Sequence, residues 1–323
     1  MPKPPLLMTR HFPPAVEARA ARDYATVPNA ADTPMSGAEI ARAAAQAEVA
    51  GVLCAAGDAM TAEAIAALPD SVRIIATFSA GTDHIDLKAA AARGIPVTNT
   101  PDVLSVATAE IAMLLILATA RRAGEGERFL RARQWTGWAP TQLMGVTLAG
   151  KKLGILGMGR IGQELARMAR GFGMEIHYRN RHPLPDAEAG GARYHDSDEG
   201  FLGAIDVLSM HIPGGAATRH WLDARRLALL RPGSIVVNTG RGSTVDDAAL
   251  CAALGSGHLR AAGLDVFDGE PRLFGGYHTT QNLVLLPHLG SATVETRDAM
   301  GHLALDNLDA VLLRGESPPN RVG

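Results

Sequence analysis

The first hundred residues alternate between short apolar runs and alanine-rich segments with helical spacing. Four apolar runs are expected to be buried strands because each is short and bounded by turn residues; they begin at Leu6, Val49, Val72 and Ile95. The intervening segments carry apolar residues at helical intervals and read EARAARDY, GAEIARAAAQA, TAEAIAALP and DLKAAAARG. Strand–helix alternation of this kind predicts a parallel sheet with helices on both faces.

The alternation restarts after a long helix expected over residues 103–119. A stretch containing glycine and tryptophan follows, and then KLGILGMG and MEIHYRNR are expected as strands on either side of the helix RIGQELARMARGFG. Four later apolar runs predict further strands: DVLSMHIP, GSIVVNTG, RAAGLDVF and LVLLPHLG. From about Thr293 to Arg314 the apolar residues again recur with helical spacing.

This pattern predicts an α/β protein with two Rossmann-like, doubly wound parallel-sheet domains joined near residue 103. The final helix is expected to return to the first domain. Ligands of such folds usually bind at the carboxyl ends of the strands. The cleft between the two domains is therefore the expected active site.

The composition is that of a globular protein and excludes several other classes. The 323 residues are 47% hydrophobic and 20% charged, with a net charge of −2, so neither nucleic acid nor a membrane is an expected partner. Cys54 and Cys251 are the only cysteines, far apart in sequence and without a CxxC pair, which argues against a disulfide framework or a thiolate metal site, and no metal is expected. The longest apolar run, from Ile111 to Ala120, is about half a membrane span. Because the amino terminus also lacks a signal-peptide core, a cytoplasmic location is expected.

A glycine fingerprint marks the start of the second alternation. Gly157, Gly159 and Gly162 form GMGRIG between an apolar strand and a helix. Such glycines serve a tight turn, close approach of the backbone to a pyrophosphate, and close helix–strand contact. The N–H groups of Arg160 and Ile161 at the helix start can then hold phosphates. An isolated GxGxxG is often only a loop, but the complete strand–turn–helix–strand context predicts dinucleotide binding.

The end of the next strand is basic where a site for NAD usually carries an acid. Asn180 stands at the place of the acid that accepts bonds from the ribose 2′-OH, and Arg179, Arg181 and His182 surround it. A carboxylate would repel a 2′-phosphate, whereas arginine pairs with one bidentately. The stretch therefore predicts a preference for NADPH, with NADH as the weaker cofactor. The alternative is a solvated basic loop without a ligand.

Polar residues follow three later strands. Arg241 follows one strand, Asp265 and Glu270 follow a second, and His288 follows a third. Reduction of a 2-keto acid needs a proton donor, for which a histidine is suited. A carboxylate would orient the imidazole, and a guanidinium would bind the substrate carboxylate. Taken singly, Arg241 could instead be a structural ion-pair partner, Glu270 a turn residue and His288 a strand cap; together they favour catalysis.

The motifs LGILGMGRIG, NTGRG, LDVFDGEP and LPHLGSAT together resemble the D-isomer-specific 2-hydroxyacid dehydrogenase family, over essentially the whole chain. The resemblance implies that Arg241 binds and polarises the substrate, that His288 is the acid/base, and that Glu270 is its carboxylate partner. By the same resemblance, Asp265 would hold the nicotinamide carboxamide. Thr239 and Gly240 would lie along the cofactor.

The resemblance also implies that the two domains bind different ligands. The substrate-binding outer domain would comprise residues 1–102 and 291–323, and the dinucleotide-binding domain residues 103–290. FSAGTDHIDL resembles the family's substrate loop, in which the N–H groups of Ala80 and Gly81 would face the substrate carboxylate.

Within the family the chain is most similar to the glyoxylate/hydroxypyruvate reductases, through GWAPTQLMG, YRNRHPLP and HIPGGAATRH. In these enzymes the arginine at the place of Arg181 serves NADPH. The tryptophan at the place of Trp138 reaches the active site of the neighbouring subunit, so a homodimer is expected. An alternative for Trp138 is hydrophobic packing in a dimer arm.

The sequence thus predicts an oxidoreductase that reduces glyoxylate or hydroxypyruvate with NADPH, with His288 as the proton donor. One alternative is an NAD-dependent D-2-hydroxyacid dehydrogenase for a larger keto acid. Another is a cofactor-sensing scaffold of the kind found among the family's corepressors, which can retain the same three residues.

Overall fold

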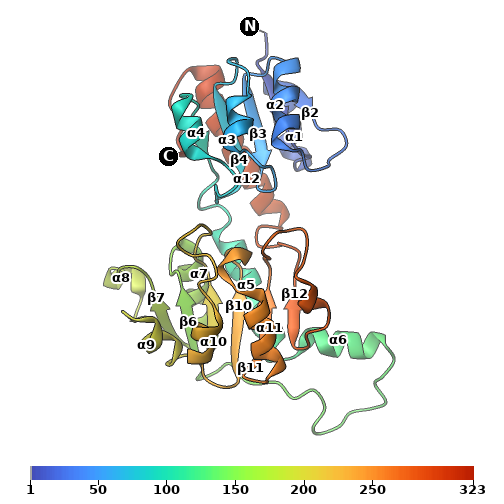
Figure 1. Ribbon diagram of the computed structural model, residues 1–323, viewed down its shortest axis with the longest axis vertical. Coiled ribbons are helices and arrows are strands. Elements are labelled where there is room, and N and C mark those ends of the chain that lie inside the picture. Colours follow the sequence, from blue (N-terminus) through green and yellow to red (C-terminus); the bar gives the residue numbers. More distant parts are fainter. Residues whose placement is uncertain (1) are drawn as a thin grey trace. The chain divides into compact units, whose positions relative to one another are not determined.

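The computed structural model describes residues 2–323, which fold into two compact α/β units (Figure 1). The first unit comprises the chain up to Leu104 together with Ala292–Gly323, and the second comprises Ser105–Ser291. Each unit has one mostly or wholly parallel sheet with an apolar core on both faces. The predicted fold class, an α/β protein with two Rossmann-like units, is confirmed.

The sheet of the first unit has the order β13-β5-β4-β3-β1-β2, and only β13 runs antiparallel to its neighbour. Its strands are β1 (Pro5–Met8), β2 (Ala25–Pro28), β3 (Gly51–Ala55), β4 (Ile74–Phe78), β5 (Val97–Thr98) and β13 (Arg321–Val322). The chain winds outward from β1 in both directions, which makes the sheet doubly wound. The sequence pattern did not predict β2 and β13, because both are short edge strands with few buried residues.

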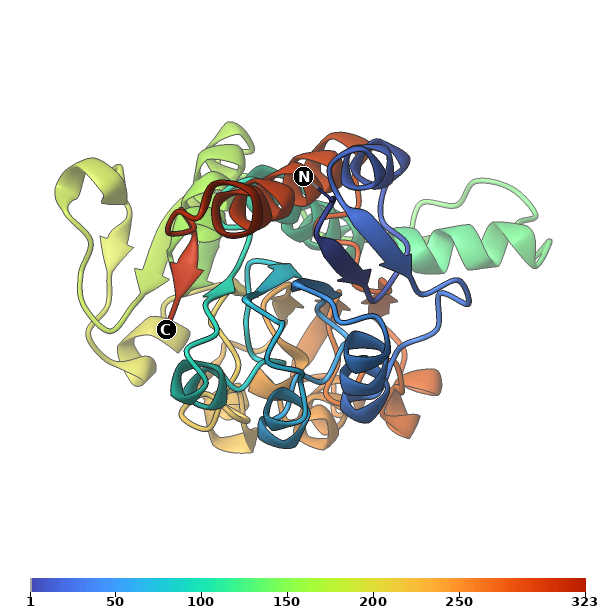
Figure 2. The ribbon, with the colours of Figure 1, turned by 90° about the horizontal axis from the view of Figure 1, so that it is seen from above.

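Helices cover both faces of this sheet. They are α1 (Pro14–Asp23), α2 (Gly37–Gln46), α3 (Ala62–Ala66), α4 (Leu87–Ala92) and α12 (Val294–Asp309), which continues as a π-helical turn over Ala310–Arg314. Figure 2 shows α12 in red and α1 in dark blue on one side of the strands, with the other helices opposite. Successive strand residues point to opposite faces, so Leu6 packs in the core beneath α1 and α12 while Leu7 packs beneath α2.

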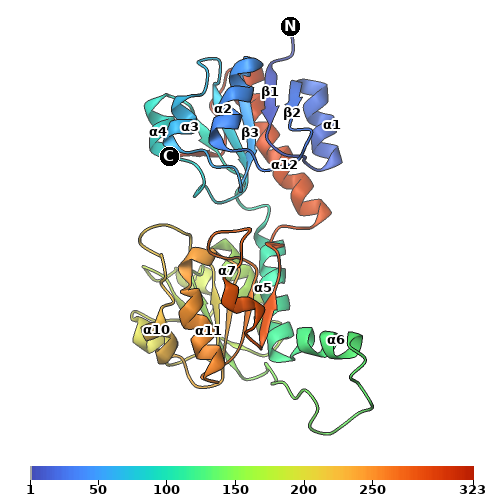
Figure 3. The same cartoon turned by 45° about the vertical axis from the view of Figure 1, so that its right-hand side comes forward.

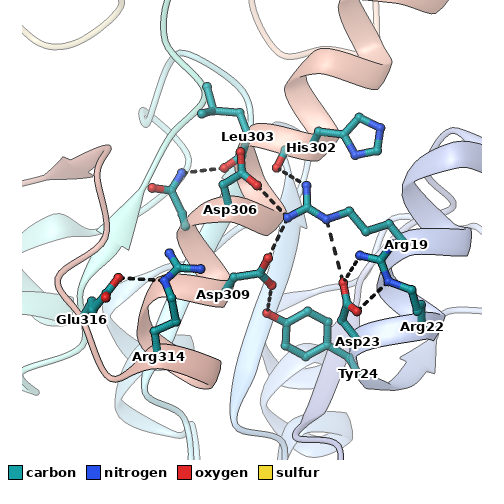
Figure 4. Close-up of polar contacts among 11 residues, drawn as sticks. Arg19, Arg22, Asp23, Tyr24, His302, Leu303, Asp306, Asp309, Arg314 and Glu316 are labelled. Carbon is teal, nitrogen blue, oxygen red and sulfur yellow. Dashed lines mark hydrogen bonds and ion pairs between the residues drawn. The ribbon is translucent and has the colours of Figure 1, made fainter.

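Charged residues fasten α12 to α1 within the first unit (Figure 4). Arg19 donates hydrogen bonds of 2.6 Å to both Asp306 and Asp309, and the buried Tyr24 hydroxyl donates to the other oxygen of Asp309. Gly301 allows the two helices to approach, since a Cβ at this position would lie 2.2 Å from a methyl group of Val16. These contacts place the carboxyl-terminal helix in the first unit.

The sheet of the second unit is entirely parallel, with the order β12-β11-β10-β9-β6-β7-β8. Its strands are β6 (Lys152–Leu156), β7 (Glu175–Arg179), β8 (Arg193–Tyr194), β9 (Val207–Met210), β10 (Ser234–Asn238), β11 (Leu259–Leu264) and β12 (Leu283–Leu285). The strand order reverses between β6 and β9. In such sheets the carboxyl ends at the reversal form a ligand-binding crevice.

Helices also cover both faces of the second sheet. They are α5 (Ser105–Ala120), α6 (Ala123–Arg131), α7 (Arg160–Gly171), α8 (Asp186–Ala189), α9 (Asp198–Leu202), α10 (Ala224–Leu229) and α11 (Asp247–Gly255), with 3-10 turns at Gly242–Thr244 and Gly275–His278. Residues of α5 and α7 share one core cluster, and residues of α9, α10 and α11 share the other. Within residues 2–323, no helix has both the length and the apolar character needed to cross a membrane.

Candidate active site

The glycine fingerprint forms the turn between β6 and α7. Gly157 has a φ of +87°, and a Cβ there would lie 3.1 Å from the backbone of Ile212. A Cβ on Gly162 would lie 2.9 Å from the carbonyl oxygen of Gly157, so this glycine permits close helix–strand contact. A Cβ on Gly159 would meet no protein atom within 4 Å. The middle glycine therefore leaves an open approach to the start of α7, which suits a pyrophosphate.

Asn180 holds this turn against the end of β7. Its side-chain oxygen accepts a 2.7 Å hydrogen bond from the N–H of Met158, and its amide nitrogen lies 3.5 Å from the Met158 carbonyl oxygen. Met158 is the buried residue between the first two glycines of the fingerprint. The carboxamide thus stabilises the glycine turn, a structural role that the sequence pattern did not reveal.

The basic residues around Asn180 differ in their surroundings. Arg179 pairs with Asp198 at 3.4 Å and donates a 2.6 Å hydrogen bond to the backbone of Asn180. Arg181 and His182 are exposed, and within residues 2–323 neither side chain forms a hydrogen bond or an ion pair. Arg181 and His182 can therefore turn toward an anionic ligand without breaking a contact, whereas Arg179 cannot.

Three neighbouring strands bring the polar residues to one edge of the second sheet. Arg241 follows β10, Asp265 follows β11 and His288 follows β12, and these strands are adjacent and parallel. The carboxyl ends of parallel strands lie at the same edge. The convergence that the sequence pattern predicts for these strand ends is therefore present.

Glu270 and His288 are in direct contact. One carboxylate oxygen of Glu270 lies 2.8 Å from Nδ1 of His288, and the other accepts a 2.8 Å hydrogen bond from the N–H of Phe267. Burial raises the pKa of Glu270, but its bond to His288 and the charges of His288 and Arg241 more than offset this and hold the pKa below its usual value. A carboxylate at this position favours a proton on Nδ1 of His288, so Nε2 is the ring nitrogen that Glu270 does not engage.

Asp265 shapes the loop that carries His288. This carboxylate is 1% exposed and accepts hydrogen bonds of 2.7 and 2.8 Å from the N–H groups of Leu289 and Gly290. The carbonyl oxygen of Asp265 also accepts a bond from the N–H of His288. Burial raises the pKa of Asp265 against the opposing effect of the two N–H donors. Asp265 thus holds the His288 loop, and its match to a nicotinamide-binding aspartate stays a prediction.

Asn238, at the end of β10, shapes the loop that carries Arg241. Its fully buried carboxamide accepts a 3.0 Å bond from the N–H of Gly240 and donates a 2.9 Å bond to the carbonyl oxygen of Arg241. A Cβ on Gly242 would lie 1.9 Å from the backbone of Phe267, so only glycine allows the Arg241 loop to pass against the Glu270 loop. Sequence reasoning did not single out Asn238 or Gly242, although they are the first and last residues of the NTGRG motif.

The residues before Arg241 lie against the end of β9. The Thr239 hydroxyl is 3.3 Å from Nδ1 of His211, and a Cβ on Gly240 would lie 2.9 Å from the carbonyl oxygen of Ile212. The same segment, His211–Ile212, also packs on Gly157. Thr239 and Gly240 therefore share a neighbour with the glycine fingerprint.

An apolar pocket of about 340 Å³ adjoins the Glu270–His288 pair. Its lining residues are Phe267, Glu270, Pro271, Leu273, Leu285, Leu286, Pro287 and His288. The pocket has the size of a site for a small apolar group.

The loop after β4 in the first unit contains Ala80 and Gly81. Within residues 2–323, their N–H groups donate to no protein atom, whereas the neighbouring carbonyl groups are hydrogen bonded. Consecutive N–H groups without protein acceptors can bind an anion. The loop geometry is thus compatible with the role expected from the sequence.

Trp138 lies on an exposed arm of the second unit. The arm consists of α6, which has no buried residue, and the following loop, and both extend away from the sheet (Figure 3). Every residue of 131–140 is exposed, and Trp138 is 81% exposed. Trp138 does not line the pocket beside His288 of its own chain. In the part of the chain that the structure describes, no group of three or more potential metal ligands comes together.

Comparison with known proteins identifies relatives along the whole chain. The family profile described as D-isomer specific 2-hydroxyacid dehydrogenase, NAD binding domain, matches residues 113–290. The chain is 41% identical to a glycerate dehydrogenase of Hyphomicrobium methylovorum over 313 residues, which are 96% of this chain and 97% of the relative. It is 46% identical to a glyoxylate reductase of Thermococcus litoralis over 256 residues, or 78% of this chain and 77% of that protein.

A solved structure shares the fold of both units. It is the NADPH-dependent glyoxylate/hydroxypyruvate reductase of Sinorhizobium meliloti in complex with NADP and malonate. The TM-score is 0.86 at 37% sequence identity, and the match covers 99% of this chain and 97% of the other.

Proposed function

Because the chain belongs to the D-isomer-specific 2-hydroxyacid dehydrogenase family, we propose that it reduces glyoxylate and hydroxypyruvate to the 2-hydroxy acids with NADPH. The observation that carries the proposal is the Glu270–His288 pair, which follows two adjacent strands beside the Arg241 loop. Relatives called glyoxylate reductase and glycerate dehydrogenase support small keto acids as the substrate class.

The cofactor supplies, when bound, the hydride that adds to the keto carbon. Nε2 of His288 donates a proton to the keto oxygen while Nδ1 remains bonded to Glu270. The guanidinium of Arg241 binds the substrate carboxylate and polarises the keto oxygen. The N–H groups of Ala80 and Gly81, in the first unit, are further proposed donors to a substrate carboxylate. One hydride and one proton thereby convert the keto group into an alcohol.

The proposed preference for NADPH is supported by the exposed side chains of Arg181 and His182, which have no protein partner in residues 2–323. The second support is the absence of a carboxylate at Asn180, where it would repel a 2′-phosphate. The NADP complex of the Sinorhizobium meliloti reductase points in the same direction.

A homodimer is proposed on the exposed arm. Trp135 and Trp138 are 52% and 81% exposed, and Leu130 on α6 is 58% exposed. Such large apolar side chains on one segment are typical of a surface that a second copy covers. In the proposed dimer, Trp138 reaches the active site of the neighbouring subunit.

A second candidate is an NAD-linked dehydrogenase for a larger keto acid. The apolar pocket of about 340 Å³ beside His288 favours it, because this volume exceeds the need of glyoxylate.

Steady-state kinetics separates the two candidates. We expect kcat/KM to be highest for glyoxylate or hydroxypyruvate with NADPH, and lower for phenylpyruvate and with NADH. A higher kcat/KM for phenylpyruvate with NADH would support the second candidate instead. NADPH binding without turnover of any keto acid would exclude both and favour a cofactor-sensing scaffold.

A further inference from the structure

Three consecutive carbonyl groups of the loop after β4 are tied to the protein. The carbonyl oxygen of Ser79 accepts a 2.9 Å bond from the N–H of Thr100. That of Ala80 accepts a 2.7 Å bond from the side chain of Asn99. That of Gly81 accepts a 2.6 Å bond from the Ser79 hydroxyl. All three peptide planes are thus fixed by one specific donor each.

The fixed carbonyl groups determine where the N–H groups of the loop point. A trans peptide unit is planar, and its N–H points opposite to its carbonyl. The N–H groups of Ala80, Gly81 and Thr82 therefore point away from the three donors. None of them donates to an acceptor among residues 2–323. The protein thus orients these donors so that they can bind an anion. Loss of any one of the three hydrogen bonds to the carbonyl oxygens would allow the N–H of the same peptide unit to rotate.

The hydrogen bond to the carbonyl oxygen of Gly81 is the last of a longer series of hydrogen bonds. The Ser79 hydroxyl lies 2.9 Å from the Thr77 hydroxyl, which lies 2.9 Å from Nε2 of His84. A hydroxyl has one proton to donate. Because Ser79 donates to Gly81, it accepts from Thr77, and Thr77 in turn accepts from His84. In this series of hydrogen bonds, Nε2 of His84 is therefore the first donor and the carbonyl oxygen of Gly81 is the last acceptor.

We propose that His84 is a positioning residue, which acts through the hydroxyls of Thr77 and Ser79 to hold the Gly81–Thr82 peptide and so to orient the N–H of Thr82 as a third donor to the carboxylate, beside those of Ala80 and Gly81. This inference rests on the proposed function, since it assigns the loop to the substrate carboxylate. Thr77 is fully buried and Ser79 is 7% exposed, so water does not readily replace a missing member of the series. The series of hydrogen bonds lies entirely within the first unit.

The decisive comparison is between Thr77→Val and Thr98→Val. Each substitution removes a fully buried threonine hydroxyl, and the two threonines lie on the neighbouring strands β4 and β5. Thr98 is a matched control, because its hydroxyl has no hydrogen-bond partner in the described chain. We expect Thr77→Val to weaken binding of oxalate to the NADPH-bound enzyme about tenfold, the equivalent of one lost hydrogen bond. The KM for glyoxylate should rise in parallel, with a smaller change in kcat and none in the Kd for NADPH.

Variants of His84 supply the second part of the test. His84→Ala should weaken oxalate as Thr77→Val does, and His84→Gln should restore much of the affinity because its amide nitrogen can donate to Thr77. Equal oxalate affinities for Thr77→Val and Thr98→Val would overturn the proposal, as would a His84→Gln variant no better than His84→Ala. Failure of the proposed function would appear separately, as a wild-type protein that binds oxalate but reduces neither glyoxylate nor hydroxypyruvate.

Discussion

At the scale of single residues, His288 illustrates how the fold prepares a side chain for chemistry. Its φ of +54° lies in the left-handed region, which non-glycine residues rarely adopt. Asp265 holds its backbone N–H and those of the two following residues, and Glu270 holds its imidazole. Strained conformations persist where neighbours determine them in this way, often at functional sites. The rigid imidazole can therefore present Nε2 in one direction.

Replacement of His288 tests this role directly. We expect His288→Ala to lower kcat about a hundredfold to ten-thousandfold, because a general acid contributes that much. Cofactor affinity, measured by NADPH fluorescence titration, should stay within about twofold of the wild type, since the fingerprint turn is untouched. Glu270→Gln is the matched variant, which removes the charge but can keep a bond to Nδ1; its loss of kcat should be smaller and should shrink at lower pH. Near-normal turnover of His288→Ala would remove His288 from the acid role.

Arg181 is the residue-scale test of cofactor preference. We expect Arg181→Ala to raise the KM for NADPH about tenfold or more while leaving the KM for NADH nearly unchanged, because the guanidinium would contact only the 2′-phosphate. Arg179→Ala is the control, since Arg179 is engaged with Asp198 and the Asn180 backbone. Equal losses with NADPH and NADH in Arg181→Ala would contradict the assignment.

At the scale of elements, a histidine pair joins β7 to the residue that follows β8. Nδ1 of His177 lies 2.8 Å from Nε2 of His195, and the two rings are stacked. Burial, together with the charges of His195, Lys152 and Arg193, lowers the pKa of His177 to about 4. Burial also lowers the pKa of His195. Both imidazoles are therefore expected to be neutral near pH 7 in the folded chain.

The lowered pKa of His177 makes stability depend on pH. Between pH 6.5 and about 4 the unfolded chain binds a proton at this position and the folded chain does not, so the free energy of unfolding falls as the pH falls. The expected loss is about 1 to 3 kcal/mol across this window. His177→Phe should reduce the loss, as measured by urea unfolding at pH 7 and pH 5. His182→Asn, at an exposed position, is the control and should leave the pH dependence of unfolding unchanged. An unchanged pH dependence in His177→Phe would contradict the prediction.

At the scale of the whole molecule, the exposed arm is the feature that a single chain leaves unexplained. The segment 131–140 buries none of its residues, yet it contains two tryptophans. Exposed aromatic side chains of this size stabilise an assembly when they become buried. The proposed homodimer gives the arm a function that the isolated chain lacks.

The assembly prediction has a direct measurement. We expect sedimentation velocity to show a dimer at micromolar concentration, and Trp138→Ala to raise the KM for glyoxylate while the dimer persists. A variant with Leu130→Asp and Trp135→Asp should instead shift the protein toward monomer, because charges would enter an apolar interface. A wild-type monomer at all concentrations would exclude the arm as a dimer contact.

Much of the fold was predictable because buried strands and alanine-rich helices have strong periodic signals. The strands with mostly buried residues were all expected from their apolar runs, whereas the two-residue strand β8 and the exposed helix α6 were not. Local sequence carries little signal where an element buries few side chains. The same reason explains the edge strands of the first unit. For the candidate site, the chemistry-bearing residues were predictable from motifs, but their supporting residues were not.

The sequence by itself determined the fold class, the position of the glycine fingerprint and the residue types available at the strand ends. These follow from local periodicity and short motifs, which depend on residues close together in the chain. Only the tertiary structure decided that Arg179 is engaged by protein groups while Arg181 and His182 are not, that Asp265 holds the His288 loop, and that His84 and Thr77 support the loop after β4. Such roles depend on hydrogen bonds between side chains and loops whose geometry arises from packing, and no sequence spacing encodes that geometry.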